Sequence, residues 1–454
     1  MTLRGTTQTR RAFVSAAAGL AGSVGLAACG GPGADQPSGS GITAALKNAV
    51  MEAWCHADSR SAWQIETLKD YNKEKGTNLT INWTRKASTG ELADNLVVAT
   101  AAGSGFPDLA DVEISQMGKL LKTPNPPLVS YNEHLKGKEV DLYKPSALDP
   151  WALNGKYYGL GNEMNAVLFT YRHDVFQQLG VRTPIATWDD LVEAGKRVLP
   201  IAPDGLFVIR TGLGTLTIFN ITAGGGYLEK GSKLILNHAN NAKALQYLVD
   251  LVHRHKVAIL DPGNDSRRAS LTGGKLVGEL GPTWRISGGM RTDAPDTSGK
   301  WMVQALPQWS ATGKKVTTTQ GGTGMTVLKE SKLKDAALDF VIWEHLTKAV
   351  LRDFDLRQVW PTYRKAYDDA RLNEPVPWFN NQRVGPILKE AADVMEPFHQ
   401  GVWWPEISTA AGKHITAALR NEKPVRQALD EAQAEARSTI EAAGGRIDAD
   451  GTIK

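Results

Sequence analysis

The spacing of hydrophobic residues alternates between the periods of a strand and a helix over the first third of the chain. Apolar or alternating runs predict strands at residues 50–55, 79–83 and 107–113. Helical spacing predicts a helix over residues 61–75 and a second helix after Ser88. This β-α-β-α-β order predicts an open, mainly parallel sheet covered by helices. Because ligands of such sheets bind beyond the carboxyl ends of the strands, we expect binding residues in the loops that follow them.

The second half of the chain continues the α/β alternation and contains no short internal repeat. The segment Thr187-Trp188-Asp189-Asp190 places a capping residue before a helical pattern, which predicts a helix start. Helical spacing predicts further helices near residues 242–252 and 334–347. The last predicted helix covers residues 424–443, with a proline in its first turn and two glycines after its end.

The composition is that of a globular protein with more than one domain. The chain has 454 residues, of which 42% are hydrophobic and 22% are charged. At about 100–200 residues per domain, this length predicts two or three domains. The 52 basic and 48 acidic residues leave a net charge of +4, without the clustered basic residues that nucleic-acid binding requires. Only two cysteines are present, which excludes a disulfide framework and a multi-cysteine metal site.

The first 28 residues have the pattern of an export signal. Paired arginines precede a modestly apolar run that ends at Leu26-Ala27-Ala28-Cys29. This segment resembles a twin-arginine signal joined to a lipoprotein box, although Val14-Ser15 stands where Leu-Lys is usual, so the export route stays open. The resemblance implies cleavage before Cys29, acylation of its thiol and anchoring at the extracytoplasmic face of the cell membrane. Residues 29–43 are rich in Gly, Ser and Pro, which predicts a flexible tether.

Three motifs between residues 154 and 191 indicate a family. They are a Gly-Lys turn, an apolar strand that ends in a Tyr-Arg-His-Asp sequence, and a Thr-Trp-Asp-Asp-Leu helix start. The segments read Asn154-Gly155-Lys156-Tyr157-Tyr158-Gly159-Leu160-Gly161, Val167-Leu168-Phe169-Thr170-Tyr171-Arg172-His173-Asp174 and Thr187-Trp188-Asp189-Asp190-Leu191. They resemble the extracellular solute-binding proteins of ABC importers, specifically the maltose-binding-like family 1. Gly161 stands where this family usually has Pro, and Arg172 where it has Asn.

Weaker motifs extend the resemblance over nearly the whole chain after Cys29. They follow the family's order and are Pro107-Asp108-Leu109, Gly224-Gly225-Gly226, Gly281-Pro282-Thr283-Trp284 and Gly321-Gly322-Thr323-Gly324-Met325.

The resemblance implies an α/β fold of the two-lobed, periplasmic-binding-protein-like type II class. Residues 44–162 and 322–372 would form the N-terminal lobe, and residues 163–321 and 373–454 the C-terminal lobe. Crossing strands would join these discontinuous lobes. Ligand in the interlobe cleft would contact both lobes and so stabilise the closed arrangement over the open one.

The function that the resemblance implies is that of a substrate-binding lipoprotein of an ABC transporter, not of an enzyme. The protein would capture an extracellular oligosaccharide by lobe closure and deliver it to permease subunits in the membrane. We expect a monomer, anchored through Cys29, that binds no nucleic acid and needs no catalytic residue, metal or cofactor.

Aromatic side chains are the first class of candidate ligand contacts, because flat rings cover the apolar faces of sugars. The chain has 13 tryptophans, more than its 10 phenylalanines or 10 tyrosines. Trp284 matches a family tryptophan that contacts sugar, and Trp403 and Trp404 match another such region. Adjacent residues point in different directions, so we expect one of that pair to face the cleft. Trp360, close to a crossing, is a further candidate.

Polar side chains that satisfy sugar hydroxyls are the second class. Glu163 and Asn162 stand at the first crossing, where the family often places a carboxylate. Loops after the first and third predicted strands carry Asp58 and Glu113. Two more candidates are Arg285, which pairs either with an anionic ligand or with a carboxylate of its own lobe, and Asn220, which precedes the glycine triplet.

Two alternative functions remain open from the residues. The same fold could bind a glycerophosphodiester, which requires convergent cations such as Arg285, Arg85 and Arg210, or a polyamine, which requires several carboxylates. A membrane-anchored glycosidase would use two acids among Asp58, Glu113 and Glu163. Cys55 beside His56 is interpreted as a buried inert thiol, because no oxyanion-hole motif accompanies the pair.

Overall fold

The computed structural model describes residues 47–230 and 232–454. The chain divides into two units, residues 1–41 and 42–454, and the account below concerns the second unit. The predicted signal, Cys29 and the predicted tether lie outside the described residues. No helix of the described residues is long and apolar enough to span a membrane.

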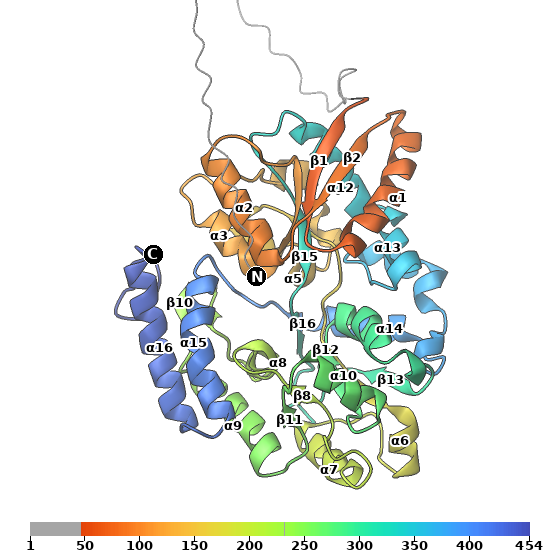
Figure 1. Cartoon of the computed structure of the whole chain (residues 1–454), viewed down its shortest axis with the longest axis vertical. Helices are drawn as coiled ribbons and strands as arrows, with labels where there is room; N and C mark the ends of the chain where they lie inside the picture. The colour runs from red at the N-terminus through yellow and green to blue at the C-terminus, as the bar shows by residue number, and fades with distance from the viewer. Residues whose placement is uncertain (1–46, 231) are drawn as a thin grey trace, which may run out of the picture. The chain divides into compact units, whose positions relative to one another are not determined.

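A five-stranded sheet begins the described unit (Figure 1). Its strand order is β2-β1-β3-β15-β6, formed by β1 (Val50–Cys55), β2 (Thr80–Arg85), β3 (Leu109–Glu113), β6 (Leu160–Gly161) and β15 (Thr323–Val327). Strands β1, β2 and β3 are parallel, whereas β15 pairs antiparallel with β3 and with β6. The predicted β-α-β-α-β unit is therefore confirmed, and a strand from much later in the chain extends its sheet.

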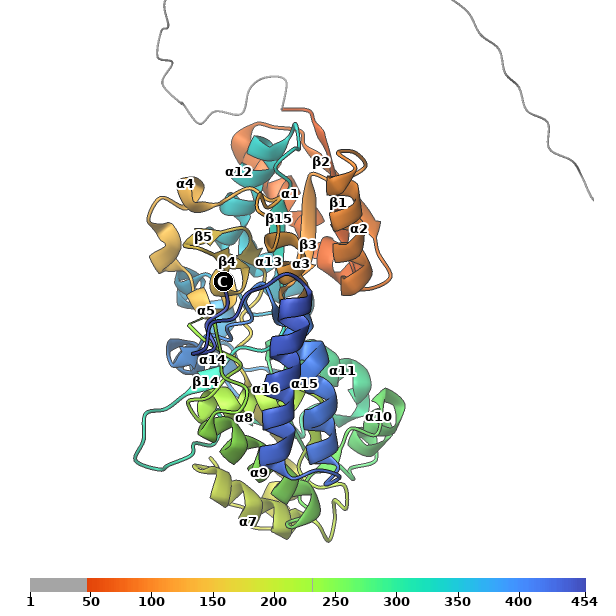
Figure 2. The same ribbon diagram turned by 90° about the vertical axis from the view of Figure 1, so that its left-hand side faces the viewer.

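Helices cover both faces of this sheet and create two separate hydrophobic cores (Figures 1 and 2). On one face, α1 (Asp58–Lys75) and α12 (Lys334–His345) pack in a core with Leu109. On the other face, α2 (Thr89–Ala101) packs with Ala110 and Val112. The alternation along β3 follows the period of two, so Asp111 lies on the same face as Leu109, toward α1 and α12.

The ends of the first two helices show how local sequence sets their bounds. α1 begins three residues before the predicted start, with Asp58 in its first turn, where a negative charge favours the helix dipole. Gly76 ends α1 in the left-handed conformation, so the helix ends at residue 75, as predicted. The Ser88 side chain accepts a hydrogen bond from the backbone nitrogen of Glu91 and so caps α2.

A smaller antiparallel sheet organises the second half of the unit. Its central strand β7 (Leu168–Arg172) lies between β12 (Gly278–Gly281) and β13 (Trp301–Gln304). One large core contains Phe169 and Tyr171 together with residues of α7 (Trp188–Val198), α9 (Ala239–His253), α15 (Trp404–Leu419) and α16 (Val425–Ala442). α7 begins with the predicted cap, in which Thr187 and Asp190 form a reciprocal capping box.

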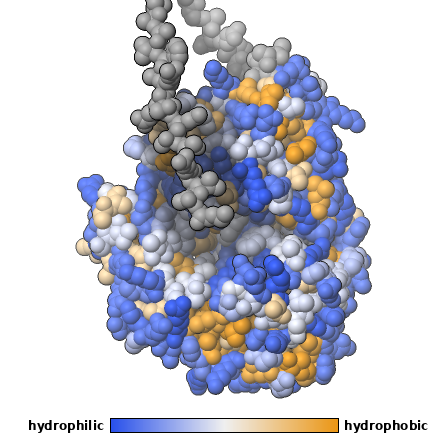
Figure 3. Space-filling view, viewed as in Figure 1, coloured by the Kyte–Doolittle hydropathy of each residue, from blue (hydrophilic) through white to orange (hydrophobic). Residues whose placement is uncertain are grey.

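The remaining elements are short. The other helices are α3 (Met117–Leu121), α4 (Asn132–Leu135), α5 (Lys144–Ala147), α6 (His173–Gln178), α8 (Gly214–Thr222), α10 (Asn264–Thr272), α11 (Met290–Asp293), α13 (Leu351–Arg357) and α14 (Val384–Asp393). The other strands are β4 (Ala152–Leu153), β5 (Lys156–Tyr157), β8 (Val208–Ile209), β9 (Leu228–Glu229), β10 (Lys233–Leu234), β11 (Ile259–Leu260), β14 (Thr317–Thr318) and β16 (Met395–Glu396). Figure 3 shows one face of the molecule as largely hydrophilic, with apolar residues gathered in small patches.

Two segments that run side by side leave the five-stranded sheet, one for β7 of the smaller sheet and the other for β14, which pairs with β16. The first joins β6 to β7 and the second joins β14 to β15. They are held together by backbone hydrogen bonds from Asn162 to the carbonyl of Thr323, at 3.0 Å, and from Val167 to the carbonyl of Thr318, at 2.9 Å. An antiparallel bridge between Ala166 and Thr319 lies between these bonds. We call residues 162–167 and 318–323 the crossing segments.

Candidate functional site

The crossing segments contact two other distant parts of the sequence. The hydroxyl of Thr283 donates to the carbonyl of Met164, and the indole nitrogen of Trp284 donates to the carbonyl of Gln320 at 3.2 Å. The backbone nitrogen of Ile114, directly after Glu113, donates to the carbonyl of Gly322 at 3.1 Å. The carboxyl end of β3 and the segment around Trp284 therefore meet at the crossing segments, next to Glu163.

A buried group of charged side chains lies beside the first crossing. It consists of His56 from the loop after β1, Arg60 from α1, Asp111 from β3 and Glu163 from the crossing segment, and we call it the polar cluster. Arg60 Nη2 lies 2.8 Å from Glu163 Oε1. His56 Nδ1 lies 3.7 Å from Asp111 Oδ2. Glu163 and Asp111 are almost completely buried.

Burial and mutual charge set the electrostatics of the polar cluster. Burial lowers the pKa of His56, which favours a neutral imidazole. Burial also raises the pKa of Asp111, against the opposing effect of Arg60. Burial opposes the charge of Arg60, but the carboxylates of Glu163 and Asp111 outweigh it and raise the pKa of the guanidinium. The cluster is thus close to charge balance, with one persistent cation and two carboxyl groups.

Each residue of the polar cluster has a buried polar atom without a hydrogen-bond partner among the described residues. These atoms are His56 Nδ1, Arg60 Nη1, Asp111 Oδ2 and Glu163 Oε2. Leaving a buried polar atom unpaired costs about 1–3 kcal/mol, and more for a charged group. The described residues supply no hydrogen-bond partner for these four atoms, which therefore call for one from outside, such as ordered water or a bound polar molecule.

Asn162 supports this cluster from behind. Its side-chain nitrogen donates to Asp111 Oδ1 at 2.8 Å and to Thr323 Oγ1 at 3.2 Å. Its side-chain oxygen lies 3.0 Å from His345 Nε2. Because its polar atoms are already engaged and it is buried, Asn162 is placed to fix the orientation of Asp111.

The predicted aromatic candidates divide by exposure. Trp284 is half-buried, and its ring lies against Gly321, where an added Cβ would approach it to 3.4 Å. Trp403 is also half-buried, and the ammonium of Lys122 sits 4.3 Å from its ring centroid. Trp404 instead packs in the core against Tyr227 and Phe398. Trp360 lies in the core too, packed against Phe354 and Tyr367.

The other polar candidates lie apart from the polar cluster or are paired within the chain. Arg285 forms buried ion pairs with Asp293 and Glu279, at 2.7 and 3.3 Å, which is the lobe-carboxylate pairing left open by the sequence. Asp58 is exposed and pairs with Arg85 at 3.0 Å. Glu113 is bonded to Ser115, and burial raises the pKa of its carboxyl group. Asn220 is buried in α8, and its side-chain nitrogen and oxygen have no partner there.

The family profile described as bacterial extracellular solute-binding protein matches residues 56–343. The chain belongs to this family. Because this family is extracellular, the protein acts outside the cytoplasm.

One curated relative and two solved structures show how far the similarity extends. The arabinooligosaccharide-binding protein of Bacillus subtilis is 28% identical over 84% of this chain and 90% of its own length. The cyclic α-maltosyl-1,6-maltose binding protein from Arthrobacter globiformis has a TM-score of 0.72, at 20% identity, over 87% of this chain and 99% of its own. Maltose-bound MalE3 of T. maritima has a TM-score of 0.67, at 20% identity, over 86% of this chain and 100% of its own. The fold is therefore the α/β periplasmic-binding-protein-like fold, as predicted.

Family membership also decides against the glycosidase alternative, because the matched family is one of solute-binding proteins and not of enzymes. The geometry agrees. Asp58 is exposed and faces Arg85, whereas Glu163 is buried and paired with Arg60, so these two candidate acids do not form a pair of facing carboxylates. Among the described residues, no group of three His, Cys, Asp or Glu side chains is arranged to hold a metal ion.

Sequence reasoning missed three members of the polar cluster as site residues, namely His56, Arg60 and Asp111. Arg60 falls inside α1, His56 was considered only as the neighbour of Cys55, and Asp111 stands between the apolar residues Ala110 and Val112 of β3. A signal for Asp111 did exist, because it shares a face of β3 with buried Leu109, where an acid needs a polar partner. Nothing in the sequence indicated that Arg60 reaches Glu163, 103 positions later.

Proposed function

We propose that this solute-binding protein is the substrate-binding component of an ABC importer and captures a neutral oligosaccharide. The polar cluster, with its four unpartnered buried atoms, is the observation that carries the proposal. Trp284, half-buried at the same crossing, supplies the aromatic surface. The names of curated relatives support the substrate class, since two of them are arabinooligosaccharide-binding proteins and a third is a lactose-binding protein.

The mixture of donors and acceptors in the polar cluster favours a polyhydroxyl ligand over the two charged alternatives. A phosphodiester needs several converging cations, but Glu163 and Asp111 stand beside the single arginine. Arg285 offers no second cation, because two carboxylates already pair with it. A polyamine needs several free carboxylates, but Arg60 neutralises Glu163. Hydroxyl groups both donate and accept, so sugars match an unpartnered set of both kinds.

Trp284 is the proposed stacking residue of this site. Its indole nitrogen is fixed by the carbonyl of Gln320, which leaves the ring face as its free chemical feature. Trp403 is the second candidate, because Lys122 already covers one side of its ring. Trp404 and Trp360 are assigned to core packing on their burial.

We further propose the mechanism of capture and delivery. Residues 44–162 with 322–372 act as one lobe, and residues 163–321 with 373–454 as the other, joined by the crossing segments. Ligand held by both lobes stabilises the closed arrangement, which is the form that permease subunits recognise. Acylation of Cys29 anchors a monomer to the membrane, and residues 29–43 act as its tether.

A ligand panel tests the proposal directly. Mature protein is titrated with arabinooligosaccharides, other neutral oligosaccharides, glycerophosphodiesters and polyamines, and its melting temperature and tryptophan fluorescence are recorded. We expect a saturable rise in melting temperature with at least one neutral oligosaccharide, because ligand bound to the native state stabilises it. A response confined to phosphodiesters or polyamines, or no response to any oligosaccharide, would contradict the proposal.

The substitution Trp284→Ala separates the stacking role from folding. We expect about a tenfold loss of oligosaccharide affinity, the upper range for one aromatic contact, with little change in melting temperature. Trp83→Ala is the control, because Trp83 is also half-buried but lies in β2, the edge strand of the five-stranded sheet, and belongs neither to the polar cluster nor to the crossing segments. Equal affinity in wild type and Trp284→Ala would remove Trp284 from the site.

A further inference from the structure

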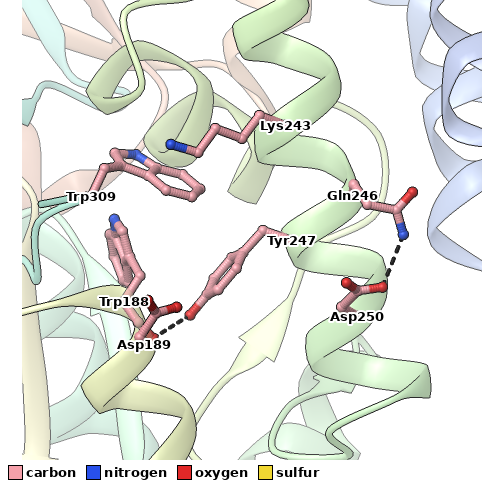
Figure 4. Close-up of a pocket in the computed structure, with 7 residues that line it drawn as sticks. All are labelled: Trp188, Asp189, Lys243, Gln246, Tyr247, Asp250 and Trp309. Atoms are coloured by element: carbon pink, nitrogen blue, oxygen red, sulfur yellow. Dashed lines mark hydrogen bonds between the residues drawn. The ribbon is translucent and has the colours of Figure 1, made fainter.

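A hollow lies between α7 and α9, on other elements than the polar cluster (Figure 4). It is lined by residues of α7, α9 and the loop after β13 and has a volume of about 350 Å³. This volume lies within the range of about 300–1,000 Å³ that is usual for small-molecule sites. Figure 1 shows α7 and α9 at the end of the unit opposite β1 and β2.

Three aromatic rings form the floor of the hollow. The ring centroids of Tyr247 and Trp309 are 5.3 Å apart, and each lies 6.2 Å from that of Trp188. Trp188 is buried, whereas the other two rings are half-buried and partly reach solvent. Figure 4 shows the three side chains converging from separate elements, so the aromatic surface is a product of the fold.

The polar ends of the two accessible rings are already engaged. The hydroxyl of Tyr247 donates to the carbonyl of Trp188 at 2.7 Å, and the indole nitrogen of Trp309 donates to Thr222 at 3.2 Å. These bonds hold the rings in place, and the property that remains for an external molecule is their apolar surface. The indole nitrogen of Trp188 is buried without a hydrogen-bond partner among the described residues, and Figure 4 shows it pointing toward Trp309.

The charges around the rings select the chemical class of the ligand. The exposed carboxylate of Asp189 and the half-buried carboxylate of Asp250 repel an anion. The ammonium of Lys243 lies 4.4 Å from the Trp309 ring centroid and already satisfies the cation preference of that ring, so it disfavours a second cation. A neutral molecule with an apolar face and hydroxyl edges fits both constraints, and carboxylate, amide and ammonium groups are all partners for hydroxyls.

We propose that this hollow is a second, weaker saccharide-binding site, which holds a neutral glycan chain at the surface. It is independent of the polar cluster, since the two share no residue and no secondary-structure element. Its aromatic floor supplies a stacking surface, and its rim of Asp189, Lys243 and Gln246 contacts hydroxyl groups. Such a site holds the protein near a glycan polymer, and the polar cluster captures fragments of that polymer.

Affinity electrophoresis tests the inference with the full mature chain. Native gels contain soluble arabinan or soluble starch, and a gel without polysaccharide gives the reference mobility. We expect at least one of the two polysaccharides to retard the wild type. The apparent affinity of Trp309→Ala, derived from its retardation, should be about tenfold lower. Trp309→Phe retains a ring and most of the packing, so it should fold normally and show an intermediate retardation.

The substitution Glu163→Gln distinguishes this site from the proposed capture site. It should keep the retardation, because Glu163 lies in the polar cluster. Loss of retardation in Glu163→Gln but not in Trp309→Ala would assign polysaccharide binding to the crossing segments and overturn the inference. Three other results would also overturn the inference. They are no retardation of wild type in either gel, equal retardation of Trp309→Ala and wild type, and a retardation that added tetramethylammonium abolishes but added free oligosaccharide does not.

Discussion

Glu344 and His345 are buried neighbours on α12 whose pKa values move in opposite directions. Burial raises the pKa of Glu344 to about 8, against hydrogen bonds from Thr67 and Gln64. Burial lowers the pKa of His345 to about 4. Since His345 Nε2 lies 3.0 Å from Asn162, this pair stands directly behind the polar cluster. Both residues are therefore expected to be uncharged near neutral pH, so they add no net charge next to the polar cluster.

The pH dependence of stability follows from these shifts. An acid with a folded pKa near 8 holds its proton where the unfolded chain has lost it, so stability falls as pH rises from about 4.5 to 8. The lowered pKa of His345 has the opposite effect, because stability rises with pH between about 4 and 6.5. This gain in stability is complete above about pH 6.5. We predict that Glu344→Gln reduces the loss of stability between pH 7 and 8, measured by urea unfolding.

Glu279→Gln is the matched control for this prediction. Burial raises the pKa of Glu279 to about 7, so its replacement should flatten the curve mainly between pH 4.5 and 7 and change the slope from pH 7 to 8 less than Glu344→Gln does. An unchanged slope from pH 7 to 8 in Glu344→Gln would show that Glu344 is ionised in the folded protein.

At the residue scale, sequence reasoning located Glu163 but not its environment. The motif placed an acid at the first crossing, and the structure puts one there. Its partner Arg60 and the acid Asp111 become neighbours only when the β1–α1 unit, β3 and the crossing segment are assembled. The sequence also could not show which way the side chains of Trp403 and Trp404 point. Their neighbours Lys122, Tyr227 and Phe398 come from other segments of the chain.

At the element scale, the contact between α3 and α15 depends on a glycine. A Cβ on Gly118 would lie 2.6 Å from the carbonyl oxygen of Val402 and 3.1 Å from Pro405. This close approach allows Lys122, the residue that follows α3, to cover Trp403 and to form an ion pair with Glu406. α3 follows β3 of the five-stranded sheet, whereas α15 packs in the core of the smaller sheet. The contact therefore links the two groups of elements away from the crossing segments.

A pair of glycine substitutions tests this contact. Gly118→Ala should destabilise the protein by about 1–3 kcal/mol, the usual effect of overpacking. Gly412, in the interior of α15, has no neighbouring atom within 4 Å of the position that a Cβ would take. Gly412→Ala should therefore stabilise the protein by about 0.5–1 kcal/mol through a better helix propensity. Chemical unfolding of both variants measures the difference, and a neutral Gly118→Ala would show that α3 and α15 do not approach closely in solution.

Local periodicity predicted the elements well because each is specified by its own residues. The capping box of Thr187 and the Gly76 stop are examples, since both act within four residues of a helix end. The start of α1 was placed three residues late because its N-cap, Ala57, makes no side-chain hydrogen bond and leaves no signal. The short strands β8, β11, β14 and β16 have two residues each and depend on partners far along the chain, so no local period marks them.

At the scale of the whole described unit, two antiparallel crossing segments lead from the five-stranded sheet to β7 of the smaller sheet and to β14. Backbone hydrogen bonds hold these segments to each other, and Trp284 and Thr283 bond to them from the side. Under the proposed function, the ligand contacts the loop after β1, β3 and α1 at the polar cluster, and Trp284 from the other part of the unit. We propose that such a ligand shifts the balance between open and closed forms by the contacts that only the closed form offers.

Calorimetric titration of the mature protein with the best oligosaccharide of the panel tests the central claim most directly. We predict a tight phase with one ligand per chain in wild type and in the control Glu279→Gln, whose carboxylate is buried and paired with Arg285 but lies outside the polar cluster. Glu163→Gln should bind at least about tenfold more weakly, because it disturbs the ion pair with Arg60 and replaces an unpartnered carboxylate oxygen. Equal affinity in Glu163→Gln and wild type, with both proteins folded, would contradict the assignment of the polar cluster as the oligosaccharide site.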